Sequence, residues 1–143
     1  MNKGGEIVVI EDDLDDQELL AEVFKSLQIP NKITFFPDGK EVVEYLLKPD
    51  VIPFLILSDI NLPILNGFEL RDRVFQNQEI SKKCIPYIFF TTAADENSVT
   101  SAYALSAQGF FKKPNGYDEL RKIIKSIIDY WNQCYSPNKF RTG

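Results

Sequence analysis

The sequence FLILSDINLP, residues 54–63, runs from a stretch of apolar residues straight into an aspartate. Residues 54–57 are all apolar, which is typical of a β-strand buried on both faces of a parallel sheet. Asp59 comes at the carboxyl end of that strand, at the mouth of the core. A carboxylate in such a position needs polar or charged partners, so the ends of the other strands decide what Asp59 can do.

Four more short apolar or β-branched runs resemble this strand, and amphipathic helix patterns separate them. The predicted strands cover residues 6–10, 31–36, 53–58, 86–91 and 109–112. The predicted helices cover about 15–27, 42–47, 68–76, 95–106 and 116–131, with a capping box at Asp15 and Glu18. This alternation predicts an α/β fold, a single doubly wound (βα)5 domain with a parallel sheet. We assign residues 1–135 to the domain and expect a flexible C-terminal tail at 136–143.

Composition narrows the possible functions. The formal net charge of −5 argues against non-specific binding to nucleic acid or to an anionic membrane. No run approaches the roughly 18 apolar residues that span a bilayer, and no signal peptide is recognisable. Histidine is absent, which excludes histidine-based nucleophilic triads and histidine-ligated metal. Cys84 and Cys134 lie too far apart for a zinc motif and fit free thiols in a reducing cytoplasm.

Polar residues follow four of the predicted strands. They are Glu11-Asp12-Asp13, Asp59, Thr91-Thr92 and Lys112-Lys113-Pro114. Each set by itself has a plain structural explanation as a helix cap, a turn or a solvated strand end. Because the carboxyl ends of parallel strands meet at one edge of a sheet, we expect the sets to converge.

Converging carboxylates repel one another unless a cation joins them, and all-oxygen ligands suit Mg²⁺. Lysine and hydroxyl groups are what a transferred phosphoryl group needs around it, and a carboxylate can accept that group as a nucleophile. Asp59 is therefore a candidate phosphoryl acceptor, and Glu11 and Asp12 are candidate metal ligands.

These motifs are similar to those of the receiver domain of two-component response regulators, from about Glu6 to Trp131. The matching stretches are VVIEDD, LILSDINLPILNG, PYIFFTTA and GFFKKP. The resemblance implies a flavodoxin-like sheet in the order 2-1-3-4-5. It also implies phosphorylation of an aspartate by the phosphohistidine of a sensor histidine kinase or phosphotransfer protein, as a phosphorelay step in the cytoplasm. The Thr-Thr pair and the connection at 75–86 further resemble small stand-alone regulators paired with phytochrome-type kinases.

The resemblance assigns a role to each matching residue. Glu11, Asp12 and Asp59 hold Mg²⁺ together with the backbone carbonyl of Asn61, and Asp59 is the residue phosphorylated. Thr91 and Lys113 contact the phosphoryl oxygens. The peptide bond between Lys113 and Pro114 is expected to be cis.

The resemblance also bears on switching and on the lifetime of the phosphorylated state. It implies that Thr91 and Phe110 form the switch, in which Phe110 rotates inward when Thr91 moves toward the phosphoryl group. Ser106 stands where a glycine is frequent, so a positive φ there would cost energy. Ala93 lacks the polar side chain that assists hydrolysis in relatives, which predicts moderate to slow loss of the phosphoryl group.

The resemblance places output on protein contacts: a downstream target, or a homodimer, bound through the face formed by residues 95–106, 109–112 and 116–131. We expect no nucleic acid or membrane partner, and no enzyme activity beyond self-catalysed, Mg²⁺-dependent phosphorylation and dephosphorylation. A pseudo-receiver that acts by binding alone is one alternative. An aspartate-nucleophile phosphatase is disfavoured because Asn61 stands where its D-x-D motif has a second acid. A flavodoxin-like cofactor binder is disfavoured because acids follow the first strand in place of a phosphate loop.

Overall fold

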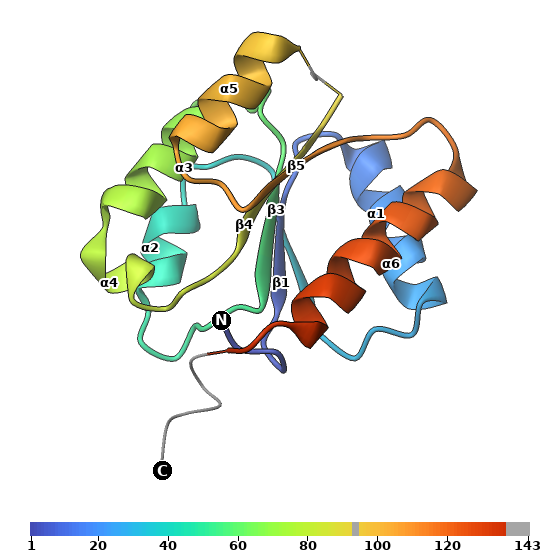
Figure 1. The fold of residues 1–143 in the computed structure, drawn as a ribbon, viewed down its shortest axis with the longest axis horizontal. Helices are drawn as coiled ribbons and strands as arrows, with labels where there is room; N and C mark the ends of the chain where they lie inside the picture. The colour runs from blue at the N-terminus through green and yellow to red at the C-terminus, as the bar shows by residue number, and fades with distance from the viewer. Residues whose placement is uncertain (93–94, 137–143) are drawn as a thin grey trace.

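The computed structural model describes residues 1–92 and 95–136. Its strands are β1 (Ile7–Ile10), β2 (Ile33–Phe36), β3 (Leu55–Ser58), β4 (Tyr87–Thr91) and β5 (Gly109–Lys112). All pair in parallel, in the order β2-β1-β3-β4-β5. The predicted sheet order is therefore confirmed. Figure 1 shows the sheet edge-on, with the strands' carboxyl ends toward the top and the N-terminus at the lower edge.

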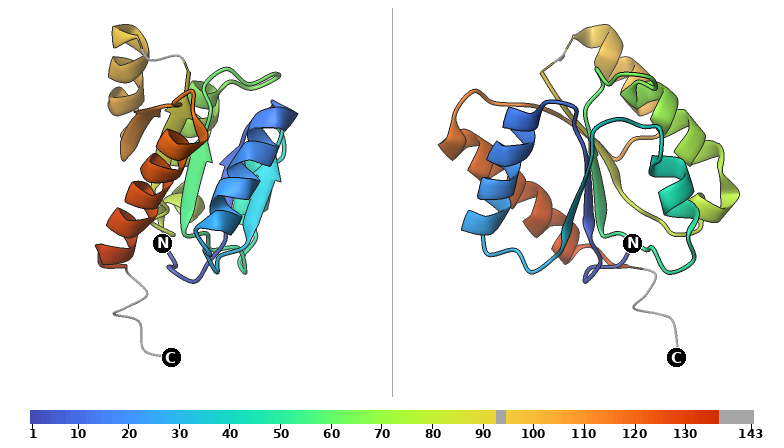
Figure 2. Two further views of the ribbon diagram at one scale, coloured as in Figure 1. Left: turned by 90° about the vertical axis from the view of Figure 1, so that its right-hand side faces the viewer. Right: turned by 180° about the vertical axis from the view of Figure 1, so that it is seen from behind.

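Helices cover both faces of the sheet, as the alternating sequence pattern predicts (Figures 1 and 2). On one face lie α1 (Leu14–Ser26) and α6 (Tyr117–Gln133). On the other lie α2 (Val42–Leu47), α3 (Gly67–Gln76), α4 (Gln78–Ser81) and α5 (Glu96–Ala104). None of the described helices combines the length and hydropathy that a bilayer crossing requires.

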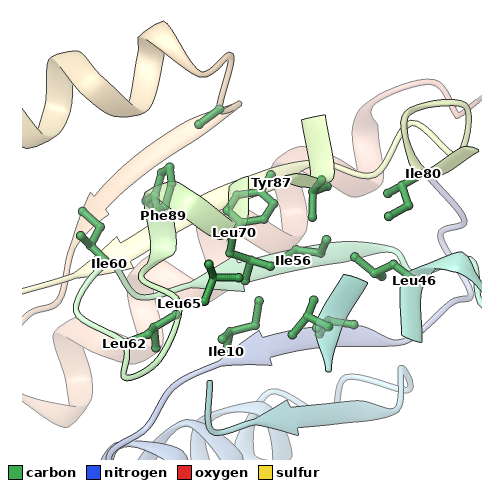
Figure 3. Packing of buried hydrophobic residues seen from close by; sticks show 14 of the residues in the cluster. Ile10, Leu46, Ile56, Ile60, Leu62, Leu65, Leu70, Ile80, Tyr87 and Phe89 are labelled. Carbon is green, nitrogen blue, oxygen red and sulfur yellow. The ribbon is translucent and has the colours of Figure 1, made fainter. Parts of the chain in front are cut away.

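Successive residues of each central strand point into different cores, which explains why these strands are apolar throughout. Val8 and Ile10 of β1 pack with α2 and α3, whereas Ile7 and Val9 pack with α1 and α6. Figure 3 shows the first of these cores, a layer of apolar side chains that runs from Phe89 past Leu70 to Leu46 and includes Ile10 of β1. With both faces buried, polar side chains are concentrated at the strand ends.

The start of α1 and the presence of α4 differ from the sequence prediction. The N-cap of α1 is Asp13, whose side chain accepts a hydrogen bond from the backbone N–H of Asp16, so the helix starts earlier than the expected capping box at Asp15. The predicted connection at 75–86 contains the one-turn helix α4, which is too short to show a periodic pattern.

The C-terminal end of α5 depends on a serine in the left-handed conformation. Ser106 has φ 58°, and the backbone N–H of Ala107 donates to the carbonyl oxygen of Ala102, as in a Schellman motif. The guanidinium of Arg71 on α3 donates to the carbonyl oxygens of Leu105 at 3.0 Å and Ser106 at 2.8 Å. A side chain from another helix thus caps α5.

Ser136 is the last described residue. It is buried, and its hydroxyl donates to the carbonyl oxygen of Met1 at 2.5 Å. The remainder of the expected tail, residues 137–143, lies outside the described residues.

Candidate functional site

A cavity of about 630 Å³ opens at the carboxyl edge of the sheet, where the sequence predicts the polar residues to converge. Its walls come from the exits of β1, β3 and β5, from the first turn of α1 and from Thr92 after β4. The lining residues are Glu11, Asp12, Asp13, Leu14, Asp15, Asp16, Asp59, Asn61, Thr92 and Lys113. Carboxylates dominate this surface, so the cavity favours cations over anions.

Lys113 lies at the centre of the charged residues. Its ammonium nitrogen forms an ion pair with Glu11 and lies 3.1 Å from Oδ2 of Asp16 and 3.1 Å from Oδ2 of Asp59. The backbone N–H of Lys113 donates to the carbonyl oxygen of Thr91 at 2.8 Å, which continues the pairing of β4 with β5 and fixes where the side chain starts. One cation therefore balances three carboxylates from three parts of the chain.

Asp59 is held by its own backbone and by the residues beside it. Its Oδ1 accepts a 2.7 Å hydrogen bond from the backbone N–H of Ile60, so Oδ2 is the oxygen that faces Lys113. Its backbone N–H donates to the carbonyl oxygen of Ile10, and its carbonyl oxygen accepts from the buried hydroxyl of Ser58. Gly67 packs so closely that a Cβ there would lie 2.2 Å from the carbonyl oxygen of Asp59. The carboxylate is thus presented to the cavity in one orientation.

Three carboxylates are arranged as a metal site would require. Glu11, Asp12 and Asp59 each offer an oxygen, and these oxygens lie within 4.8 Å of one another. The side-chain amide of Gln17 donates to the carbonyl oxygen of Glu11 at 2.6 Å and so supports the loop that carries the first two ligands. An all-oxygen set of this kind suits a small, hard divalent cation.

Burial controls the protonation of the site. Glu11 is only 2% exposed, and burial raises its pKa to about 7, although its hydrogen bond and ion pair with Lys113 act in the opposite direction. Burial by itself would lower the pKa of Lys113, but the hydrogen bond with Glu11 and the charges of Asp59 and Glu11 raise it above its ordinary value. Lys113 is therefore cationic across the physiological range, whereas Glu11 keeps its proton to a higher pH than an exposed glutamate does.

The structure brings most of the predicted site residues together. Glu11, Asp12, Asp59, Asn61 and Lys113 all line the one cavity, whereas Thr91 does not. Thr91 is fully buried at the end of β4, and its neighbour Thr92 lines the cavity instead. The role of Thr91 stays a prediction.

Phe110 lies away from this cavity. Its ring packs against Phe89 with 6.2 Å between centroids, and it lines a separate cavity of about 370 Å³ with Tyr103 and Tyr130. Ala93, which bears on the predicted lifetime, lies outside the described residues.

The predicted isomer of one peptide bond is wrong, and the sequence did not reveal one of the residues that contact Lys113. No peptide bond within residues 1–92 and 95–136 is cis, so the bond between Lys113 and Pro114 is trans, the lower-energy isomer for most X–Pro bonds. The missed participant is Asp16, which contacts Lys113. Since Asp13 is the N-cap, Asp16 is the third helical residue, a position whose side chain reaches back toward the strand exit.

Comparisons with known proteins agree with this geometry. The family model of the response regulator receiver domain matches residues 7–125. The response regulator Rcp1 of Synechocystis is 28% identical over 130 residues, covering 87% of each chain.

Several solved structures of response regulators match 92% of this chain. The phosphorylated cyanobacterial phytochrome response regulator RcpA has a TM-score of 0.82 and 25% identity, with 97% of its own chain covered. The Mn²⁺-bound form of Rcp1 has a TM-score of 0.79 and 27% identity, with 99% of its own chain covered. The similarity therefore extends over nearly the whole length of these regulators.

Proposed function

This chain belongs to the response regulator receiver domain family, and from that premise we propose that it is a stand-alone response regulator phosphorylated on Asp59. The phosphoryl donor is the phosphohistidine of a sensor histidine kinase or phosphotransfer protein. The observation that carries the proposal is that Oδ2 of Asp59 faces the cavity 3.1 Å from the ammonium of Lys113, beside the carboxylates of Glu11 and Asp12. An acceptor, a fixed cation and candidate metal ligands thus share one site.

The donor set fits a divalent cation such as Mg²⁺. Glu11, Asp12 and Asp59 would hold it with carboxylate oxygens that already lie within 4.8 Å of one another, and Asn61 would add its backbone carbonyl. When bound, the cation offsets the repulsion between these carboxylates and the oxygens of an incoming phosphoryl group. That a related regulator, Rcp1, has a Mn²⁺-bound form supports the choice of a divalent ion.

Asp59 acts as the nucleophile in the proposed transfer. Because Ile60 N–H occupies Oδ1, Oδ2 attacks phosphorus; an O–P bond forms as the N–P bond of the donor's phosphohistidine breaks, and the imidazole leaves with its electron pair and takes a proton. The ammonium of Lys113 offsets the charge on the phosphoryl oxygens. The hydroxyl of Thr91 donates a hydrogen bond to another phosphoryl oxygen after the end of β4 shifts toward the site.

Phosphorylation adds about two negative charges at one end of β3, and this change is the signal. In our proposal Thr91 moves toward the new charge and Phe110 follows it inward, away from Tyr103 and Tyr130. The face made by α5, β5 and α6 then binds a downstream protein or a second copy of the chain. Two free thiols, Cys84 and Cys134, support a cytoplasmic location. Activity on a separate substrate forms no part of the proposal.

The test is phosphorylation by acetyl phosphate, followed by intact-mass spectrometry with and without Mg²⁺. We expect one added phosphoryl group that requires Mg²⁺ and is lost in Asp59→Asn. Asp15→Asn is the matched control, because Asp15 lines the same cavity but makes no ion pair with Lys113 in the described structure. A folded protein that takes no phosphoryl group from acetyl phosphate or from phosphohistidine donors would instead be a pseudo-receiver that acts by binding alone.

A further inference from the structure

Lys113 and a divalent cation compete for the same oxygens. Lys113 contacts three carboxylates. Two of them, those of Glu11 and Asp59, also belong to the cluster of carboxylates that fits a divalent cation. An ammonium and a dication repel strongly at such short range, so the lysine contacts must weaken when the cation binds. The third carboxylate, Asp16, contacts Lys113 but lies outside that cluster.

Asp16 differs from the other two carboxylates in its surroundings. Its side chain is 42% exposed, whereas that of Glu11 is 2% exposed and that of Asp59 11%. Its position is fixed, since its backbone N–H is bound by the side chain of Asp13 in the N-cap of α1. A lysine ammonium has three donors, so Lys113 can keep its contact with Asp16 while it gives up the others.

We propose that Asp16 is a positioning residue that retains the ammonium of Lys113 at the cavity when a divalent cation occupies Glu11, Asp12 and Asp59. The inference rests on the proposed function of this site and adds a residue to it. Asp16 lowers the cost of bringing the cation next to Lys113 in two ways: it gives the ammonium another partner, and it partly neutralises the ammonium's charge. Without Asp16, Lys113 stays on Glu11 and Asp59 for a larger fraction of the time and competes more strongly with the cation.

The experiment measures Mn²⁺ affinity by electron paramagnetic resonance, with Mg²⁺ as competitor, and needs no phosphorylation. We expect Asp16→Asn to weaken Mn²⁺ binding about three- to tenfold. The control Asp15→Asn removes the same charge one residue away, also from the cavity wall, and we expect a change below about twofold for this exposed group. Asp16→Glu, which keeps a carboxylate on the same turn of α1, restores affinity.

A double-mutant cycle with Lys113→Met separates action through the lysine from a direct charge effect. In the Lys113→Met background, Asp16→Asn should weaken Mn²⁺ binding no more than Asp15→Asn does. Equal effects of Asp16→Asn and Asp15→Asn in the wild-type background would overturn the inference. So would an Asp16→Asn effect that persists in full without Lys113.

The outcomes also separate this inference from the proposed function. The double-mutant cycle could give the expected Mn²⁺ affinities while the wild-type protein never accepts a phosphoryl group. That result would support the role of Asp16 and refute phosphorylation. Protein that is phosphorylated on Asp59, yet shows no difference between Asp16→Asn and Asp15→Asn, would refute the role of Asp16 alone. The melting temperature of each variant checks that its fold is intact.

Discussion

Gly67 lies against Asp59 so closely that the first residue of α3 has no room for a side chain. A Cβ at position 67 would lie 2.2 Å from the carbonyl oxygen of Asp59 and 2.8 Å from the Cα of Ile60. Both contacts are to backbone, which cannot rotate away as a flexible side chain would. The start of α3 and the candidate phosphoacceptor are therefore a single packed unit.

Gly67→Ala should consequently disturb the fold at Asp59. We expect the free energy of unfolding to fall by about 2–3 kcal/mol, because backbone must move to accept the methyl group. The matched control is Gly4→Ala, where a Cβ would meet one side-chain atom at 3.8 Å, and a change within about 0.5 kcal/mol is expected. Urea denaturation measures both variants, and equal stabilities would show that the loop between β3 and α3 yields freely.

Glu11 predicts a pH dependence of stability in the metal-free protein. Burial raises its pKa to about 7 in the folded state, so the folded protein binds this proton more tightly than the unfolded chain does. The resulting stabilisation is complete below the unfolded pKa, near 4.5, and is lost as pH rises through about 7.

Glu11→Gln, which mimics the protonated carboxyl group, should remove this loss. The free energy of unfolding of wild type minus that of the variant should fall by roughly 3 kcal/mol between pH 4.5 and 8. Denaturation at a series of pH values, in the presence of a chelator, measures the difference. If the difference grew with pH instead, the ion pair with Lys113 would outweigh the effect of burial.

Replacing Arg71 should loosen the C-terminal end of α5. Arg71→Met leaves the carbonyl oxygens of Leu105 and Ser106 without their guanidinium donor, and we expect a loss of about 1–3 kcal/mol. Hydrogen exchange should also quicken at the amides of Ser106 and Ala107. The control Arg73→Met removes an exposed arginine from the same helix and should change stability by less than about 0.5 kcal/mol. Unchanged hydrogen exchange at these amides in Arg71→Met would mean that the guanidinium does not stabilise the end of α5.

Ser106 predicts a stabilising substitution. Its φ of 58° strains a side chain but suits glycine, so Ser106→Gly should raise the free energy of unfolding by about 0.5–1 kcal/mol. Ser101→Gly makes the same change inside α5, at an exposed position, and should lower stability by a similar amount because glycine is a poor helix former. Thermal melts compare the two, and a loss of stability in Ser106→Gly would contradict the assignment of strain.

The sheet and most of the site could be predicted because the relevant signals are local. Strands buried on both faces are continuous apolar runs, and polar residues that follow such runs must meet at one edge of a parallel sheet. Those two rules, together with the resemblance of four short motifs, place Glu11, Asp12, Asp59 and Lys113 around one cavity. The positive φ at Ser106 fits the glycine that relatives often carry there, although the sequence alone left open whether the helix ends in this conformation.

What the sequence did not reveal depends on contacts between distant residues or on very short elements. The ion pair of Asp16 with Lys113 joins residues 97 positions apart, and no local pattern marks Asp16 among five neighbouring acids. Because the N-cap is Asp13 and not Asp15, Asp16 lies in the first turn of α1, where its side chain lines the cavity. The four residues of α4 are fewer than a hydrophobic period needs to become visible. The burial of Thr91 and the exposure of Thr92 also depend on how β4 ends against β5.

The central claim is that the phosphoryl group resides on Asp59, and borohydride reduction tests it most directly. Borohydride converts an aspartyl phosphate to homoserine, so protein treated with acetyl phosphate and Mg²⁺, reduced and digested, reports the modified residue by peptide mass spectrometry. We predict homoserine at position 59 in wild type, none without Mg²⁺, and none in Asp59→Asn. Reduction at Asp12, Asp13 or another carboxylate, with Asp59 intact, would contradict the account.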